Sequence, residues 1–247
     1  MQNVKVSFEP TTDQMATIKE WLFIEDEKKK FDGFYCNWNS IEYSWERNEI
    51  AIILNNEVPI GFITWWLSDK VAKIQIAEIK PGFRKKGYGR LLTETTLNRL
   101  KGHGIMVSYL HCQPAKSENT WTKIGFSRFP DVPSFKHYNN GEEGRHLYRI
   151  LVPHLEINEL VKTDEQIQLW SVERYEADKY APQWEWQLSF DKGSRRLVKP
   201  IIFPANCKWN IRWVRNNETI KSDEIKYFSK QEIAFNNFVI IEEMAAQ

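Results

Sequence analysis

The chain has 247 residues, 42% of them hydrophobic and 27% charged, which is the composition of a soluble globular protein. Its 34 basic and 33 acidic side chains leave a formal net charge of +1, so no overall field favours nucleic acid or an anionic membrane surface as a partner. Three widely spaced cysteines and the lack of a long apolar stretch favour a cytoplasmic protein with neither a disulfide framework nor a membrane span. The length predicts one or two domains, and we expect two.

The first 153 residues alternate between strand and helix patterns. Apolar residues recur with period two in the expected strands and with period 3.6 in the expected helices, and turn residues separate them. In chain order we expect a strand at Val4–Phe8, a helix capped by Thr11-Thr12-Asp13 and ending near Trp21, short helical pieces up to Arg47, strands at Glu49–Leu54, Val58–Leu67 and Val71–Ile79, a helix at Gly87–Leu100, a strand at Ile105–Cys112, a short helix at Ser117–Ile124, and strands at Phe126–Phe129 and His146–Val152.

The pattern changes near Pro153-His154, where strand-like runs replace helical periods. We expect a helical piece at Glu156–Val161 and then strands at Gln168–Arg174, Trp184–Phe190, Leu197–Phe203, Trp209–Val214 and Ile225–Phe228. Such a series predicts a smaller β-sandwich-like domain at residues 154–247, after a first domain at residues 1–153. Four tryptophans of the second expected domain form either part of its core or an outward-facing binding platform. They are Trp184, Trp186, Trp209 and Trp213.

A basic, glycine-containing turn connects the strand that ends at Ile79 to the helix that begins at Gly87. Free backbone N–H groups at a helix N-terminus, together with the positive end of the helix dipole, can bind a pyrophosphate. The glycines remove side chains that would block the anion, and the neighbouring lysines and arginines add positive charge. Alone, the turn would fit a basic surface loop better than an anion site, and its sequence context reverses this preference.

Two motifs supply that context. Arg84-x-x-Gly87-x-Gly89, preceded by Ile79-x-Pro81 and followed later by Trp121-x-Lys123-x-Gly125-Phe126, resembles the GNAT superfamily of N-acetyltransferases over residues 4–153. The resemblance implies an α+β fold with a mixed central sheet flanked by helices. It also implies that acetyl-CoA, the co-substrate, lies where the strands at Val71–Ile79 and Ile105–Cys112 separate.

The resemblance further implies a set of cofactor-binding residues and direct transfer of the acetyl group to a primary amine. A backbone N–H near Ile79 or Lys80 is expected to polarise the thioester carbonyl. The acceptor is expected to be a small molecule, a peptide or a protein, and no metal is expected. The expected cofactor-binding residues are Ile79, Arg84, Lys85, Lys86, Gly87, Tyr88, Gly89 and Arg90.

The residues for proton transfer depart from the family pattern. Trp121 stands where many members carry an acidic tyrosine, and Gln113-Pro114 stands where an asparagine is common. Glu78 and His111 are the candidate general bases, although each also fits an ordinary strand position. Tyr88 and Tyr109 are alternative acids, and catalysis by positioning alone, with proton transfer through water, also fits.

Two functions from different classes follow. In the first, the chain is an active N-acetyltransferase whose second domain shapes the acceptor site or a homodimer interface. In the second, a catalytically weak or inactive domain binds acyl-CoA or other proteins. The intact Arg84-x-x-Gly87-x-Gly89 motif favours the first function. The aromatic segment from Trp21 to Trp45 either lines the acceptor side of the cleft or forms a local core.

Overall fold

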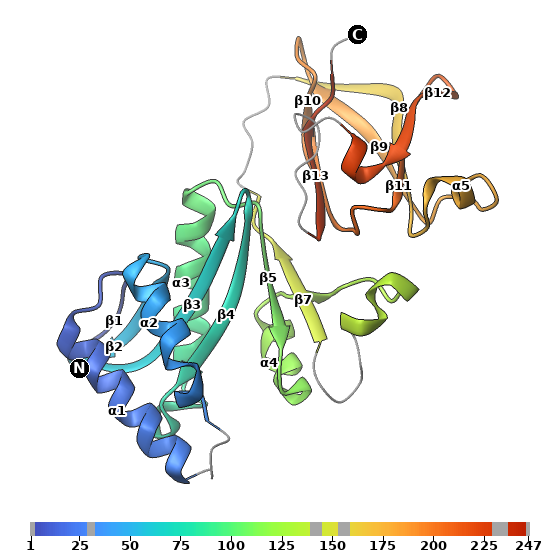
Figure 1. The fold of residues 1–247 in the computed structure, drawn as a ribbon. Coiled ribbons are helices and arrows are strands. Elements are labelled where there is room, and N and C mark those ends of the chain that lie inside the picture. The colour runs from blue at the N-terminus through green and yellow to red at the C-terminus, as the bar shows by residue number, and fades with distance from the viewer. Residues whose placement is uncertain (1–2, 29–32, 139–144, 153–158, 229–236, 246–247) are drawn as a thin grey trace. The chain divides into compact units, whose positions relative to one another are not determined.

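The computed structural model describes residues 3–28, 33–138, 145–152, 159–228 and 237–245. The chain divides into two compact units (Figure 1). The first unit comprises residues 1–127 and 146–151, and the second comprises residues 128–145 and 152–247. The segment Arg128–Arg145, expected in the first domain, is therefore grouped with the second unit. Among the described residues, no helix is both long and apolar enough to cross a membrane.

The first unit contains a mixed seven-stranded sheet flanked by helices, which confirms the expected fold class. The strand order is β1-β2-β3-β4-β5-β7-β6; β1 to β4 pair antiparallel, and β4 pairs with β5 in parallel. The strands are β1 Val4–Ser7, β2 Ile50–Asn55, β3 Val58–Ser68, β4 Val71–Ile79, β5 Val107–Cys112, β6 Ser127–Arg128 and β7 Arg145–Ile150. The α-helices are α1 Thr12–Lys28, α2 Trp38–Glu46, α3 Tyr88–Gly102 and α4 Glu118–Lys123, with single 3-10 turns at Tyr35–Asn37, Pro81–Phe83 and Ala115–Ser117.

Helices cover both faces of this sheet (Figure 1). Apolar side chains form a separate core on each face. On one face α3 packs through Leu92, Leu97 and Leu100. On the other face α1 and α2 pack through residues that include Trp21 and Trp38. The aromatic segment after Trp21 thus supplies part of a local core, as one of its two interpretations proposes.

The start of α1 is a capping box, as the Thr11-Thr12-Asp13 cluster suggests. The Thr11 N–H donates to Gln14 Oε1 at 3.0 Å, and the Gln14 N–H donates to Thr11 Oγ1 at 3.2 Å. The helix extends to Lys28, well beyond the expected end at Trp21, because its buried acidic residues have tertiary partners. Asp26 Oδ1 accepts the Gly33 N–H at 2.9 Å, and Glu25 binds Arg84.

The second unit is rich in β-structure, as expected, and its six antiparallel strands follow one continuous order, β12-β11-β8-β9-β10-β13. Ile225–Phe228 is not a strand, since Ile225–Tyr227 is a 3-10 turn; β12, a polar edge strand, and β13 were not predicted. The expected helix at Glu156–Val161 lies largely outside the described residues, and β8 already begins at Leu160. The elements are η4 Pro133–Tyr138, β8 Leu160–Trp170, α5 Arg174–Ala177, β9 Trp184–Asp191, β10 Arg196–Pro204, β11 Asn210–Arg215, β12 Glu218–Glu224 and β13 Phe238–Glu243.

The tryptophans of the second unit contribute mainly to its core. Trp209 and Trp213 are buried, whereas Trp184 and Trp186 are half-buried. Trp184 stacks on Trp209 with ring centroids 5.4 Å apart. The core interpretation therefore holds for Trp209 and Trp213.

Glu165 is a buried charge at the centre of the second unit. Its carboxylate accepts two hydrogen bonds from Arg195, each 2.7 Å long, and one of 2.9 Å from Trp213 Nε1. Burial by itself would raise the pKa of Glu165, but the hydrogen bonds from Arg195, Trp213 and Arg215 outweigh it and lower the pKa below its ordinary value.

We expect Glu165→Gln to lower the free energy of unfolding of the second unit by about 3 kcal/mol, because it leaves the Arg195 guanidinium without its carboxylate. Since the folded-state pKa lies below the unfolded value of 4.5, the stabilisation is present above that pH and is lost as pH falls through the folded pKa. Urea denaturation at pH 7 and in the acid range measures the free energy of unfolding. The part of its pH dependence that Glu165 contributes should be seen in the unmodified chain and be missing in Glu165→Gln. Glu159→Gln, which breaks only an exposed pair with Lys192, is the control and should change little.

Candidate active site

The turn between β4 and α3 is shaped by two residues in the left-handed region. Lys85 has a φ of 61° and Gly87 a φ of 87°. Gly87 is the N-cap of α3 and no side chain caps this end, so the first N–H groups of the helix face outward. A Cβ at Gly89 would lie 3.5 Å from Ile79 Cγ1, whereas one at Gly87 would meet nothing within 4 Å. Glycine is thus favoured at position 87 by the left-handed backbone conformation and not by lack of space. The turn forms an open anion-binding nest.

Strand β4 loses its β5 neighbour halfway along its length, although it stays paired with β3 to its end. Its parallel register with β5 ends at the pair Ile74–Leu110. One residue later Gln75 is skipped in the antiparallel register with β3, which makes it a β-bulge. The Ile76 N–H beside the bulge donates to Thr64 Oγ1 at 3.2 Å. Beyond the bulge β4 is unpaired on its β5 side, as the expected separation of these two strands requires.

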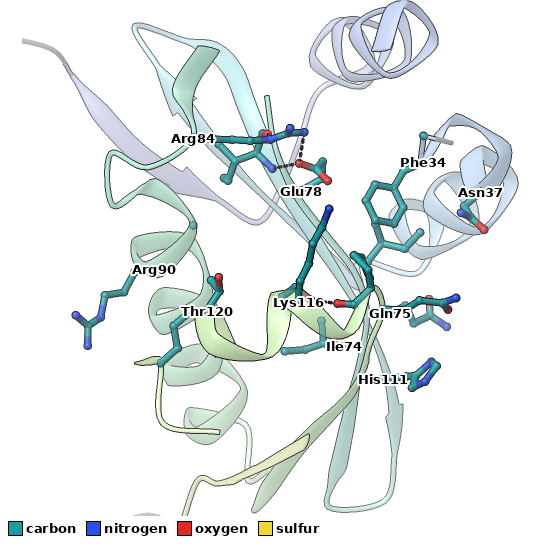
Figure 2. Close-up of a pocket in the computed structure, with 18 of the residues that line it drawn as sticks. Phe34, Asn37, Ile74, Gln75, Glu78, Arg84, Arg90, His111, Lys116 and Thr120 are labelled. Atoms are coloured by element: carbon teal, nitrogen blue, oxygen red, sulfur yellow. Dashed lines mark hydrogen bonds and ion pairs between the residues drawn. The ribbon is translucent and has the colours of Figure 1, made fainter. Parts of the chain in front are cut away.

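A cavity of about 1490 Å³ extends from this opening to the turn before α3 (Figure 2). It exceeds the 300 to 1,000 Å³ typical of a site for one small ligand, so it has room for two substrates. One wall comes from the turn and from the segment around α4, and the opposite wall comes from the segment around the start of α2. Residues on the α4 side include Lys116, Thr120 and Lys123, and those on the α2 side include Phe34, Asn37 and Ser40.

Most of the expected cofactor-binding residues line this cavity, but two do not. Lys86 Nζ donates to the Gly82 carbonyl at 2.9 Å, and the Tyr88 ring packs near Phe83 with centroids 6.3 Å apart. Neither Lys86 nor Tyr88 is among the described residues that line the cavity. The expected residues that do line it are Ile79, Arg84, Lys85, Gly87, Gly89 and Arg90.

Positive charge predominates in the cavity wall. Among the described residues that line it, six are lysine or arginine, and Glu78 is the only carboxylate. Lys73 lies on β4 before the bulge, away from the turn. The others lie at the turn, on α3 or around α4, where they suit a ligand with several phosphate groups. These residues are Arg84, Lys85, Arg90, Lys116 and Lys123.

The guanidinium of Arg84 is directed at protein groups. Its Nε donates to the Ile79 carbonyl at 2.8 Å, and its Nη2 donates to Glu25 Oε1 at 2.7 Å and to Glu78 Oε1 at 2.8 Å. Figure 2 shows Arg84 beside Glu78 at one end of the cavity. Arg84 therefore contributes to the site mainly by fixing the end of β4. The ion-pair partner of Glu78 is thus Arg84.

The two backbone N–H groups expected to face the thioester have other acceptors. The Lys80 N–H donates to the Ile60 carbonyl at 2.9 Å, and the Ile79 N–H donates to Glu78 Oε1 at 3.0 Å. Successive N–H groups of a strand point to opposite sides. Because the N–H groups of Lys80 and Ile76 point toward β3, that of Ala77 points toward the opening between β4 and β5. Ala77 also lines the smaller cavity in this opening, next to Gln75 and His111.

Glu78, the first candidate base, lies on the α1 and α2 side of β4, and its side chain is largely buried. Both of its hydrogen bonds, from Arg84 and from the Ile79 N–H, end on Oε1, while Oε2 accepts none from the described residues. Burial raises the pKa of Glu78 above 4.5, Arg84 lowers it, and the negative charge of Glu25 raises it; the net direction is upward.

His111, the second candidate base, lies at the other end of the view in Figure 2, near Gln75. Its ring stacks on His146 with centroids 4.8 Å apart. Burial lowers the pKa of His111 below 6.5, and the positive charge of Lys73 lowers it further. A neutral imidazole at pH 7 can accept a proton, so the structure places both candidates in the cavity wall without choosing between them.

Trp121 and Cys112, near this opening, both contact neighbouring side chains. The Trp121 ring packs edge-on against Phe126, with ring centroids 5.4 Å apart, and is half-buried against the core on the α3 face of the sheet. Cys112 is buried, with Sγ 3.0 Å from Ser117 Oγ. Within the described part of the chain, no group of three or more His, Cys, Asp or Glu side chains is placed to hold a metal ion.

Comparison with known proteins yields one family and several solved structures of similar fold. Residues 14–126 match the model of the acetyltransferase (GNAT) family. Ard1 from Thermoplasma volcanium is 14% identical, with 61% of this chain and 99% of that chain covered and a TM-score of 0.47. The ribosomal-protein-S18-alanine N-acetyltransferase from Escherichia coli is 14% identical, with 62% and 97% covered and a TM-score of 0.48. The PaiA N-acetyltransferase from Thermoplasma acidophilum, in complex with coenzyme A, is 16% identical, with 60% and 99% covered and a TM-score of 0.44. None of the curated proteins matches the sequence.

Proposed function

Because residues 14–126 form an acetyltransferase domain of the GNAT family, which uses acetyl-CoA as its co-substrate, we propose that this protein transfers the acetyl group directly to a primary amine of a small molecule, a peptide or a protein. The observation that carries the proposal is the continuity of the cavity. It joins an anion nest at the start of α3 to an opening between β4 and β5 where backbone and carboxylate groups meet.

The residues present suit coenzyme A. The backbone N–H groups at Gly87 and Gly89 would hold the pyrophosphate, and Lys85 and Arg90 would add positive charge beside it. Lys116 and Lys123, around α4, would bind the remaining phosphate. The thioester supplies the acetyl group. We assign the polarising hydrogen bond to the Ala77 N–H, since the N–H groups of Ile79 and Lys80 already have acceptors.

Glu78 is the general base in this proposal. Arg84 and the Ile79 N–H hold Oε1, so Oε2 is the oxygen that accepts the proton from the acceptor amine. A pKa raised by burial brings this carboxylate closer to the range in which a base is effective at neutral pH. His111, neutral at pH 7, is the alternative base and lies nearer to the bulge.

Calorimetric titration with acetyl-CoA tests the cofactor assignment, and release of free thiol across a panel of amines tests the reaction. We expect saturable binding of one acetyl-CoA per chain and thiol release with at least one amine. No binding at millimolar acetyl-CoA would reject the proposed function. Binding without thiol release from any amine would support the inactive acyl-CoA-binding alternative.

A further inference from the structure

We propose that Glu25, on α1, is a positioning residue for this reaction: it holds Arg84 and so sets the position of Glu78 at the end of β4. The inference rests on the proposed role of Glu78 as the base. Glu25 precedes Arg84 by 59 residues and belongs to neither sequence motif. It lies on the helix that packs against the face of the sheet from which Glu78 projects.

The three side chains form one compact arrangement. Arg84 Nη2 lies 2.7 Å from Glu25 Oε1 and 2.8 Å from Glu78 Oε1, so both carboxylates share one donor nitrogen. The side chains of Glu25 and Glu78 are only 9% and 14% exposed, whereas that of Arg84 is 37% exposed. Charge-assisted hydrogen bonds to such buried carboxylates are short and direction-dependent, so they fix geometry well.

Glu25 also limits how strongly Arg84 neutralises Glu78. With Glu25 present, Arg84 Nη2 is divided between two carboxylates; without it, the same group would bind Glu78 alone. Arg84 lowers the pKa of Glu78 and the charge of Glu25 raises it, so both consequences of removing Glu25 act in the same direction. Glu78 would become a weaker base held by a tighter ion pair.

A second consequence concerns the cofactor turn. The Nε of Arg84 binds the Ile79 carbonyl, directly before the turn that ends in Gly87. Through Arg84, Glu25 therefore connects α1, which contributes to the core on one face of the sheet, to the end of the strand that precedes the anion nest. A residue with only a structural role in α1 would affect stability without changing the titration of Glu78.

The test compares Glu25→Gln and Glu25→Asp in the full chain. Carbon-13 NMR follows the carboxyl titration of Glu78, which is assigned by its loss in Glu78→Gln, and calorimetry measures acetyl-CoA binding. We expect the titration midpoint of Glu78 to move to lower pH in Glu25→Gln and less far in Glu25→Asp. Acetyl-CoA affinity should stay within about threefold, because Arg84 keeps its bond to the Ile79 carbonyl.

Asp26→Asn is the matched control, since Asp26 is the next residue on α1 and equally buried but binds the Gly33 N–H. This variant should destabilise the chain without moving the Glu78 midpoint. An unchanged midpoint in both Glu25 variants would overturn the role of Glu25, even with acetyl-CoA binding intact. If Glu25→Gln does not fold, Glu25→Asp alone decides by the same criterion. If the unmodified chain does not bind acetyl-CoA, the proposed function itself is rejected.

Discussion

Gly87→Glu is expected to abolish acetyl-CoA binding while the chain remains folded. Gly87 has a φ of 87°, and an added Cβ would meet nothing within 4 Å, so the substitution introduces backbone strain but no steric overlap. The new carboxylate would stand in the anion nest and repel the pyrophosphate. We expect the dissociation constant for acetyl-CoA to rise at least about a hundredfold, equivalent to roughly 2.7 kcal/mol, as measured by calorimetry.

Gly104→Glu is the control that separates the effect of backbone strain from the effect of losing the anion site. Gly104 has a φ of 83°, an added Cβ there also meets nothing within 4 Å, and the residue does not line the cavity. Both substitutions should lower the free energy of unfolding by roughly 1 to 2 kcal/mol, because each places a side chain in the left-handed region. Only Gly87→Glu should lose acetyl-CoA. Equal affinities in the two variants would show that the turn is not the pyrophosphate site.

Features encoded by neighbouring residues could be predicted from the sequence. The bounds of β4 agree with the alternation over Val71–Ile79, and the left-handed Gly87 lies where the glycine turn requires it. The cap of α1 likewise follows from Thr11 and Gln14, three residues apart. In each case a repeating pattern or a single conformational requirement acts within a few residues.

Features that depend on distant residues could not be predicted in this way. Nothing near Glu25 indicates that Arg84 will bind it, and α1 therefore extends beyond the end that its local sequence predicts. The Glu78 carboxylate, which Arg84 holds, accepts the Ile79 N–H, and this moves the assigned donor from Ile79 to Ala77. A polar edge strand such as β12 carries no apolar face that alternation could reveal.

Glu78→Gln is expected to lower kcat by about 10² to 10³ and to leave the affinity for acetyl-CoA within about threefold. Glutamine keeps the size of the side chain and an oxygen for the Ile79 N–H, but it cannot accept the proton. Since the base must be ionised, the rate of the unmodified enzyme should rise with pH through the pKa of Glu78, which burial places above 4.5. This acid limb should disappear in Glu78→Gln when thiol release is followed against pH.

His111→Gln distinguishes the two candidate bases. The position of the acid limb alone does not, because the pKa of Glu78 is raised above 4.5 while that of His111 is lowered below 6.5. If Glu78 is the base, His111→Gln keeps the acid limb and Glu78→Gln removes it. The reverse result would assign the proton transfer to His111. Glu78 would then be a structural partner of Arg84, and its substitution would affect stability more than rate. Which of the two variants loses the acid limb therefore decides whether the Glu78–Arg84 pair at the end of β4 takes part in proton transfer.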